Sequence, residues 1–146
     1  MIKNLPDMTI LPSKAWVFAQ KKHGGQLDDD SKNYFDYHVQ PVAIIVEMVT
    51  SDEEIIAAAY LHDTLEDTDT TYEELKCEFG KRVADLVFEV THVGKKDNVG
   101  YSFPNLKSRD AILIKFADRL QNLSRMDSWD EKRKQHYLNH SIFWRK

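Results

Sequence analysis

Acidic and imidazole side chains gather at the end of an apolar run in the segment AAAYLHDTLEDTDTT, residues 57–71. His62 lies seven residues after Ile55 and so continues its helical apolar stripe, and Asp63 follows directly. An ionised carboxylate on an apolar face is costly unless it is paired or binds a metal ion. The segment therefore predicts a buried polar site at the end of a core helix.

Two further segments place a similar side chain on an apolar helical face. His38 lies four residues before Val42, on a stripe that runs to Val49, and Asp118 lies in the apolar segment AILIKFADRLQNL. Two imidazoles and two carboxylates from three helices suit a divalent ion. Mixed nitrogen and oxygen donors favour Mn²⁺, Fe²⁺, Co²⁺ or Zn²⁺ over Ca²⁺. Such an ion lowers the pKa of bound water and polarises a phosphoryl oxygen.

The elements that would position these side chains are helices, because almost every periodic segment of the 146-residue chain has the helical period. We expect an all-α fold of five to seven helices around one core. Helix starts are expected at Ser13, at Ser51 or Asp52, and at the Thr71–Glu74 capping box, and a helix end at Gly80. A long helix is expected from about Leu106 to Met126, and a last one from Asp127 or Ser128.

Composition excludes several classes of function. The net charge of −4 argues against a nucleic-acid-binding surface, which needs a basic stripe. The longest apolar run, residues 55–61, is far shorter than the ~20 residues that span a bilayer, and no targeting segment is predicted. The single cysteine, Cys77, is expected to be a buried reduced thiol, which fits a cytoplasmic protein.

Taken together, LHDTLEDT, the upstream His38 and IKFADRLQNL resemble the HD superfamily of metal-dependent phosphohydrolases. The sequence is most similar to the RelA/SpoT-type hydrolase domain and its small relatives, the metazoan SpoT homologues, from about Ala15 to Arg125. The resemblance implies a helical bundle of the HD type in a single domain, residues 1–146. Its motif-bearing core would span about 13–126, followed by a C-terminal helix at about 128–144.

Each motif residue takes a role from this resemblance. Glu66 and Asp67 match the catalytic acidic pair, and on a continuing helix Glu66 would share a face with His62. A carboxylate beside the metal can orient the attacking water and accept its proton. The implied metal is Mn²⁺, and the implied metal ligands are His38, His62, Asp63 and Asp118.

The implied substrate-binding residues lie on the long helix. Lys115 and Asn122 match residues that approach the substrate phosphates, and with Asp118 and Arg125 they form one polar column at helical spacing. A phosphate ester needs such charge neutralisation together with directional donors. The predicted substrate-binding residues are therefore Lys115, Asn122 and Arg125.

Two departures from the family pattern affect these expectations. The proline that usually follows the first ligand histidine is displaced to Pro41, which a helix can accommodate in its first turn. In place of the Arg-Lys pair that contacts the base, the loop carries acids at Asp28 to Asp30, which cannot stack on a purine as arginine does.

The resemblance predicts an enzyme that removes the 3′-pyrophosphate from guanosine 3′,5′-bis(diphosphate), ppGpp, with no synthetase domain. A first alternative is an HD phosphatase acting on another nucleotide, such as NADPH or a deoxynucleotide. A second is a non-catalytic nucleotide sensor that keeps the metal ligands. In every case the expected partner is a small phosphorylated nucleotide, not a nucleic acid or a membrane.

Overall fold

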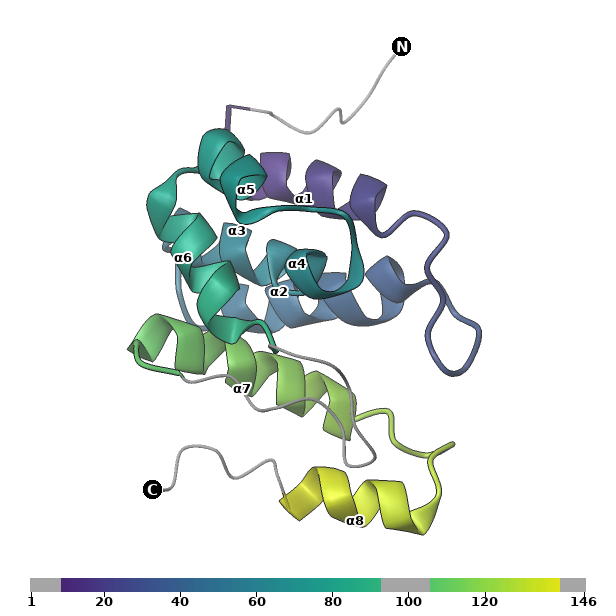
Figure 1. Cartoon of the computed structure of the whole chain (residues 1–146). Coiled ribbons are helices and arrows are strands. Elements are labelled where there is room, and N and C mark those ends of the chain that lie inside the picture. The colour runs from purple at the N-terminus through teal and green to yellow at the C-terminus, as the bar shows by residue number, and fades with distance from the viewer. Residues whose placement is uncertain (1–8, 93–105, 140–146) are drawn as a thin grey trace.

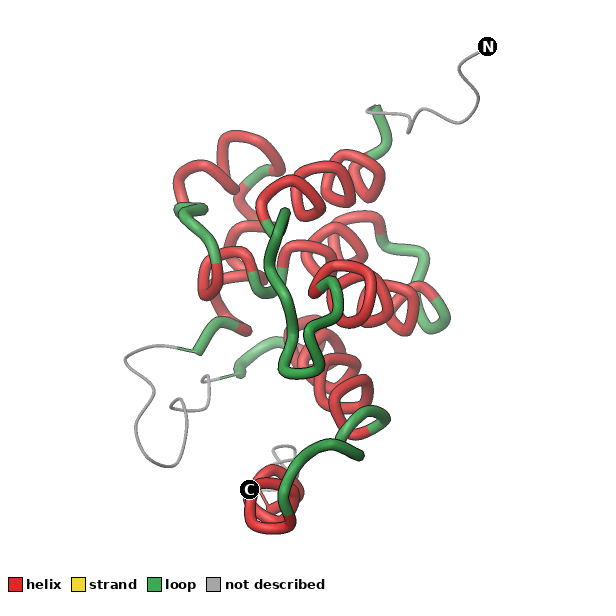
Figure 2. Tube along the Cα trace, turned by 90° about the vertical axis from the view of Figure 1, so that its right-hand side faces the viewer, coloured by secondary structure: helices red, strands yellow, loops and turns green. Residues whose placement is uncertain are grey.

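The computed structural model describes residues 9–92 and 106–139, which form an all-α fold as predicted (Figure 1). In this part of the chain, Leu27 and Asn33 form an isolated bridge and no strand is present (Figure 2). Seven of the described α-helices have eight or more residues. The elements are α1 (Leu11–Lys22), the π-helical turn η1 (Phe35–Val39), α2 (Gln40–Glu47), α3 (Glu53–Leu61), α4 (Thr64–Asp67), α5 (Tyr72–Phe79), α6 (Lys81–Val90), α7 (Arg109–Leu123) and α8 (Glu131–Asn139).

Helix α3 forms the centre of the core. Every residue from Ile55 to Leu61 is buried, and the helix contacts α1, α2, α6 and α7. A helix that is apolar on all sides is buried on all sides, which explains why this segment is a continuous apolar run rather than a narrow stripe. The small side chains of Ala57, Ala58 and Ala59 allow the surrounding helices to approach closely. This helix, and the His62 that follows it, therefore lie in the interior of the fold.

Side-chain caps fix several helix starts. Asp52 accepts hydrogen bonds from the backbone N–H groups of Glu54 and Ile55, and Thr71 accepts one from Glu74, as predicted. Ser108 caps α7 in the same way, and that helix is shorter at both ends than the predicted range. Gly80 ends α5 with φ at +92°, a conformation that side chains rarely adopt.

Three local predictions are wrong. Ser13 does not cap α1, because Pro12, which favours the first helical turn, already lies inside the helix. Val49 is 64% exposed, since α2 ends before it. Cys77 is exposed, because α5 packs through other residues on its opposite side.

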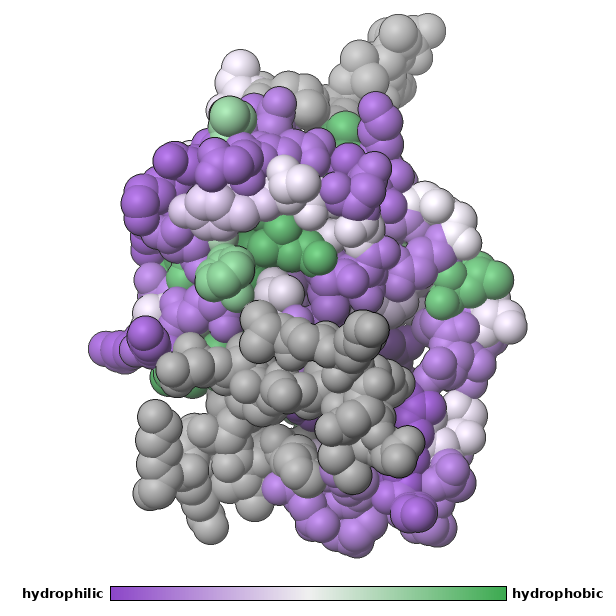
Figure 3. Space-filling view, in the orientation of Figure 1, coloured by the Kyte–Doolittle hydropathy of each residue, from purple (hydrophilic) through white to green (hydrophobic). Residues whose placement is uncertain are grey.

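The last helix, α8, lies beyond α7 at the edge of the molecule (Figure 1). It begins later than predicted, after Asp130, whose side chain accepts a hydrogen bond from the backbone N–H of Arg133 at 2.7 Å. The predicted helix end near residue 144 lies outside the described residues. Among the described residues, hydrophilic side chains make up most of the face seen in Figure 3. No helix among the described residues is long and apolar enough to cross a membrane.

Candidate metal centre and active site

A break in the helical backbone presents the His-Asp pair. Helix α3 ends at Leu61, and Asp63 leaves helical geometry before α4 begins at Thr64. Side chains take over the hydrogen bonds at this end: His62 Nδ1 lies 2.7 Å from the Ala59 carbonyl, and Thr64 donates to the Leu61 carbonyl. The His-Asp pair thus lies at the end of a core helix, as predicted, and α3 does not continue through Glu66. The break leaves His62 Nε2 3.8 Å from Asp118 Oδ1 on α7.

The structure brings all four predicted ligands together. His38 Nε2 lies 3.3 Å from His62 Nε2 and 3.1 Å from Asp118 Oδ1. Asp63 Oδ2 lies 3.3 Å from His38 Nε2 and 3.0 Å from His62 Nε2. Donor atoms of His38, His62 and Asp118 all lie within 4.8 Å of one another. His38 is supplied by η1, and such π-helical turns are frequent at functional sites.

The hydrogen bonds behind the two imidazoles fit a metal ion. Gln121 Nε2 donates to the Tyr37 carbonyl at 2.8 Å, so its oxygen faces His38 Nδ1, 2.7 Å away. His38 Nδ1 must therefore donate, as His62 Nδ1 does toward a backbone carbonyl. In the neutral rings both lone pairs then lie on the Nε2 atoms that face each other, an arrangement that a cation between them stabilises. This His/His/Asp cluster, with both Nε2 lone pairs directed inward, indicates a divalent metal ion.

The imidazoles and carboxylates of the cluster shift one another's pKa values. Burial lowers the pKa of His38, but hydrogen bonds from it to Asp118 and Asp63 outweigh this effect and raise it to about 9. Burial would raise the pKa of Asp118, but the charge of Lys115 and the imidazoles hold it well below its usual range. Buried carboxylates thus remain ionised here by sharing protons with the imidazoles, or by sharing a cation.

The predicted acidic pair lies on α4, next to the cluster. Glu66 accepts a hydrogen bond from the backbone N–H of His92 at 2.9 Å. Burial and the nearby charge of Asp63 raise the pKa of Glu66 to about 7. Asp67 is exposed and accepts a hydrogen bond from Gln26. Partial desolvation and the Asp63 charge raise the pKa of Asp67 to about 6.

Lys115 and Asn122 extend the site along α7. Lys115 Nζ is buried between Asp118 Oδ2, at 3.0 Å, and His92 Nε2, at 2.8 Å. Asn122 Nδ2 lies 3.4 Å from Asp118 Oδ1 and 2.9 Å from the hydroxyl of Tyr137 on α8. The predicted polar column is thus a connected row of side chains that begins at the cluster.

Arg125, the last member of the predicted column, is paired with the acidic loop. Its guanidinium lies 2.7 Å from the carboxylate of Asp28 and 3.3 Å from the side-chain oxygen of Asn122. Asp29 pairs in turn with Arg133 of α8 at 2.6 Å. The acids of this loop therefore hold it against the end of α7 and against α8.

Several residues of the site were not predicted from the sequence. Gln121 orients His38, Tyr34 donates to Asp63 Oδ2 at 2.6 Å, and His92 contacts both Glu66 and Lys115. Gln121 follows Asp118 by three residues and so shares its helical face, which is the one sequence signal that could have identified it. Tyr34 and His92 lie outside every motif and reach the site only through the tertiary fold.

The fold is all-α, and His38, the His62–Asp63 pair and Asp118 meet at a helix break. This is the arrangement that the resemblance to HD phosphohydrolases implies. A model of the HD domain family matches residues 15–143. The chain therefore belongs to the HD domain family, which confirms the resemblance seen in the sequence.

Two relatives and one solved structure are similar to this chain over most of its length. A guanosine-3′,5′-bis(diphosphate) 3′-pyrophosphohydrolase of Aquifex aeolicus is 43% identical over 145 residues, covering 92% of this chain but 20% of that protein. The pyrophosphohydrolase MESH1 of Danio rerio is 35% identical over 134 residues, covering 83% of this chain and 74% of MESH1. A solved structure of a metazoan ortholog of SpoT that hydrolyses ppGpp has a TM-score of 0.74 and 29% identity, covering 93% of this chain and 83% of its own. The chain thus spans about a fifth of the Aquifex relative and most of MESH1.

Proposed function

We propose that this protein is a ppGpp 3′-pyrophosphohydrolase, a metal-dependent enzyme that releases pyrophosphate from the 3′ position of the nucleotide. One observation carries the proposal: two imidazoles with oriented Nε2 atoms meet two carboxylates beside a buried ammonium group and a second acidic pair. The Aquifex aeolicus protein and MESH1 both carry the name of this activity, which supports it.

The proposed metal ligands are His38, His62, Asp63 and Asp118. Their mixed nitrogen and oxygen donors suit Mn²⁺, which we propose as the working ion. When bound, a divalent ion polarises the phosphoryl oxygens and lowers the pKa of a water molecule. The roles of the other residues follow from their positions around these four side chains.

Glu66 and Asp67 are the proposed acid–base pair. The pKa of about 7 for Glu66 and about 6 for Asp67 would let either carboxylate take up a proton from an attacking water near neutral pH. Lys115 brings a positive charge and Asn122 an amide donor to the same side of the cluster, where they would bind phosphate oxygens. Arg125 remains a weaker candidate for substrate binding, because Asp28 already neutralises it.

The acidic loop favours a second candidate substrate. Asp28 and Asp29 bind Arg125 and Arg133, so this loop cannot supply the basic side chains that the resemblance leads one to expect at the base. A different phosphorylated nucleotide, such as NADPH or a deoxynucleotide, is therefore the alternative. For either substrate we propose a cytoplasmic location.

A substrate panel with Mn²⁺ tests the proposal. The purified protein is given ppGpp, NADPH and deoxynucleoside triphosphates, and released phosphate and pyrophosphate are measured, with Asp63→Asn as a matched inactive control. We expect fastest turnover of ppGpp, with pyrophosphate as the product. Rapid turnover of another nucleotide beside intact ppGpp would support the alternative substrate, and tight nucleotide binding without any turnover would support a sensor.

A further inference from the structure

Asp67 is held by a side chain from outside its own helix. Gln26 Nε2 donates to Asp67 Oδ2 at 3.3 Å, and Gln26 Oε1 lies 2.7 Å from His23 Nδ1. A primary amide has one donor end and one acceptor end, so the bond to Asp67 turns the amide oxygen toward His23. His23 Nδ1 therefore carries the proton and donates it to Gln26.

His23 is unusual for a core residue. It is 1% exposed, and its Nε2 has no hydrogen-bond partner within the described part of the chain. Burial lowers the pKa of His23, which favours the neutral ring with a single N–H. A buried ring nitrogen without a partner is unfavourable, and an apolar side chain would avoid it. The feature that distinguishes this imidazole from an apolar residue is the N–H that it donates to Gln26.

The backbone around Gln26 is also fixed. Its N–H donates to the His23 carbonyl at 2.9 Å, and its carbonyl accepts from the Tyr34 N–H at 3.0 Å. Gly25, with φ at +82°, makes the turn between α1 and this position. Tyr34 in turn donates to Asp63. One loop thus connects α1 both to Asp67 and to a proposed metal ligand.

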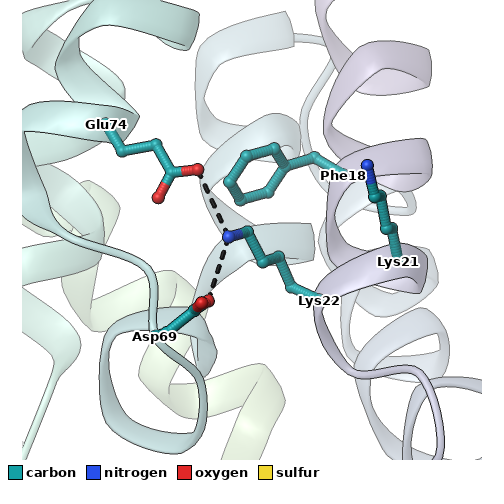
Figure 4. Close-up of a pocket in the computed structure, with 5 residues that line it drawn as sticks. All are labelled: Phe18, Lys21, Lys22, Asp69 and Glu74. Atoms are coloured by element: carbon teal, nitrogen blue, oxygen red, sulfur yellow. Dashed lines mark hydrogen bonds and ion pairs between the residues drawn. The ribbon is translucent and has the colours of Figure 1, made fainter.

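A second link joins α1 to the segment after α4, and it differs in kind. Lys22 bridges Asp69 at 3.0 Å and Glu74 at 3.3 Å (Figure 4). The Asp69 side chain is 86% exposed, and none of these three residues is a predicted site residue. Lys22 therefore offers a matched control: it ties α1 to Asp69 and Glu74, which follow α4.

We propose that Gln26 is a positioning residue for Asp67 and that His23 holds the Gln26 amide in the orientation this requires. Gln26 occupies Oδ2 and leaves Oδ1 of the carboxylate to act on the substrate or its attacking water. The inference rests on the proposed function, in which Asp67 belongs to the acid–base pair. Hydrogen bonds of this kind are often long before substrate binds and shorten in the complex.

Kinetics of matched variants test the role. Gln26→Met keeps the length of the side chain and removes the amide, so kcat should fall about tenfold, the effect of losing one hydrogen bond to a charged group. KM and Mn²⁺ affinity measured by calorimetry should stay close to wild type, whereas the melting temperature should fall, because the buried His23 loses the hydrogen bond from its Nδ1 to Gln26. Lys22→Met should keep wild-type kcat. Equal losses in the two variants, or none in Gln26→Met, would overturn the positioning role.

Nitrogen-15 NMR of the histidine rings, without substrate or metal, separates this inference from the proposed function. The wild-type His23 should carry its proton on Nδ1, and Gln26→Met should shift the population toward the Nε2–H form. An active wild-type protein with His23 protonated on Nε2 would refute this inference alone. A wild-type protein with the expected tautomer but no turnover of any nucleotide would refute the proposed function, and with it the positioning role.

Discussion

Asp118 has a double role at the centre of the site. One carboxylate oxygen lies 3.1 Å from His38 Nε2, and the other lies 3.0 Å from Lys115 Nζ. Asp63 and Asp118 together carry two negative charges, and the buried ammonium of Lys115 neutralises one of them. A divalent cation would leave the cluster with one net positive charge, which suits a phosphate substrate.

Single substitutions should distinguish residues that bind the metal ion from residues that transfer a proton. Asp63→Asn removes a proposed ligand, so we expect both Mn²⁺ affinity and activity to fall more than about tenfold. Glu66→Gln keeps the shape and should lower kcat by about 10²–10⁴-fold with little change in affinity. Calorimetry with Mn²⁺ and steady-state kinetics on the same preparations measure both. Full activity in Asp63→Asn would contradict the proposed ligand set.

Residue type and spacing predicted the cluster because His62, Asp63 and Asp118 are polar groups on otherwise apolar helical faces. The same reasoning did not identify Gln121 or Tyr34, although Gln121 shares the helical face of Asp118. Neutral amides and phenols are common on helices and in loops, and the Gln121–His38 bond joins residues 83 positions apart. Only the packing of α7 against η1 gives that glutamine its role.

At the scale of elements, the break between α3 and α4 was the main feature that periodicity missed. A stripe at helical spacing predicts where a helix runs, but it does not predict that the side chains of His62 and Thr64 bind the last carbonyls of α3. The buried helix itself, by contrast, followed directly from its apolar composition. The helix is interrupted at the residues whose polar groups form the site.

The junction between α5 and α6 depends on one glycine. Gly80 has φ at +92° and ψ at 165°, which other residues rarely adopt, although a β-carbon at this position would meet no atom of the described residues within 4 Å beyond its chain neighbours. Gly80→Ala should therefore destabilise the protein by about 1–3 kcal/mol through backbone strain alone. Thermal unfolding measures this, with the exposed Cys77→Ala in α5 as control. An unchanged melting temperature in Gly80→Ala would contradict the strain argument.

The acidic loop should stabilise the fold in a pH-dependent way. Asp28 accepts backbone N–H groups of Asp30 and Lys32 and pairs with Arg125, and these contacts outweigh burial and lower its pKa below 3.8. Because the folded pKa is the lower one, this stabilisation is present above the unfolded value and is lost as pH falls through the folded value.

Urea unfolding across pH 3–7 tests this loop. Asp28→Asn should cost about 1–2 kcal/mol at pH 7, with a smaller difference from wild type at acidic pH. Asp30→Asn, in the same loop but exposed, serves as the control. A pH-independent difference would show that the charge of Asp28 does not contribute.

For the molecule as a whole, the proposed ligands join three parts of the chain: η1, the α3–α4 junction and α7. An ion that binds only the folded protein stabilises it by about 2.7 kcal/mol at a concentration 100 times its Kd. Mn²⁺ should therefore raise the melting temperature of the wild type by several degrees and that of Asp63→Asn much less. Equal shifts in the two proteins would indicate metal binding elsewhere.

The most direct test of the central claim follows ppGpp with the Mn²⁺-loaded protein by phosphorus-31 NMR. The account predicts that the resonances of the 3′-diphosphate disappear, that free pyrophosphate and GDP appear in equal amounts, and that Glu66→Gln forms both products at least about 10²-fold more slowly. Intact ppGpp after prolonged incubation with the metal-loaded wild type would contradict it.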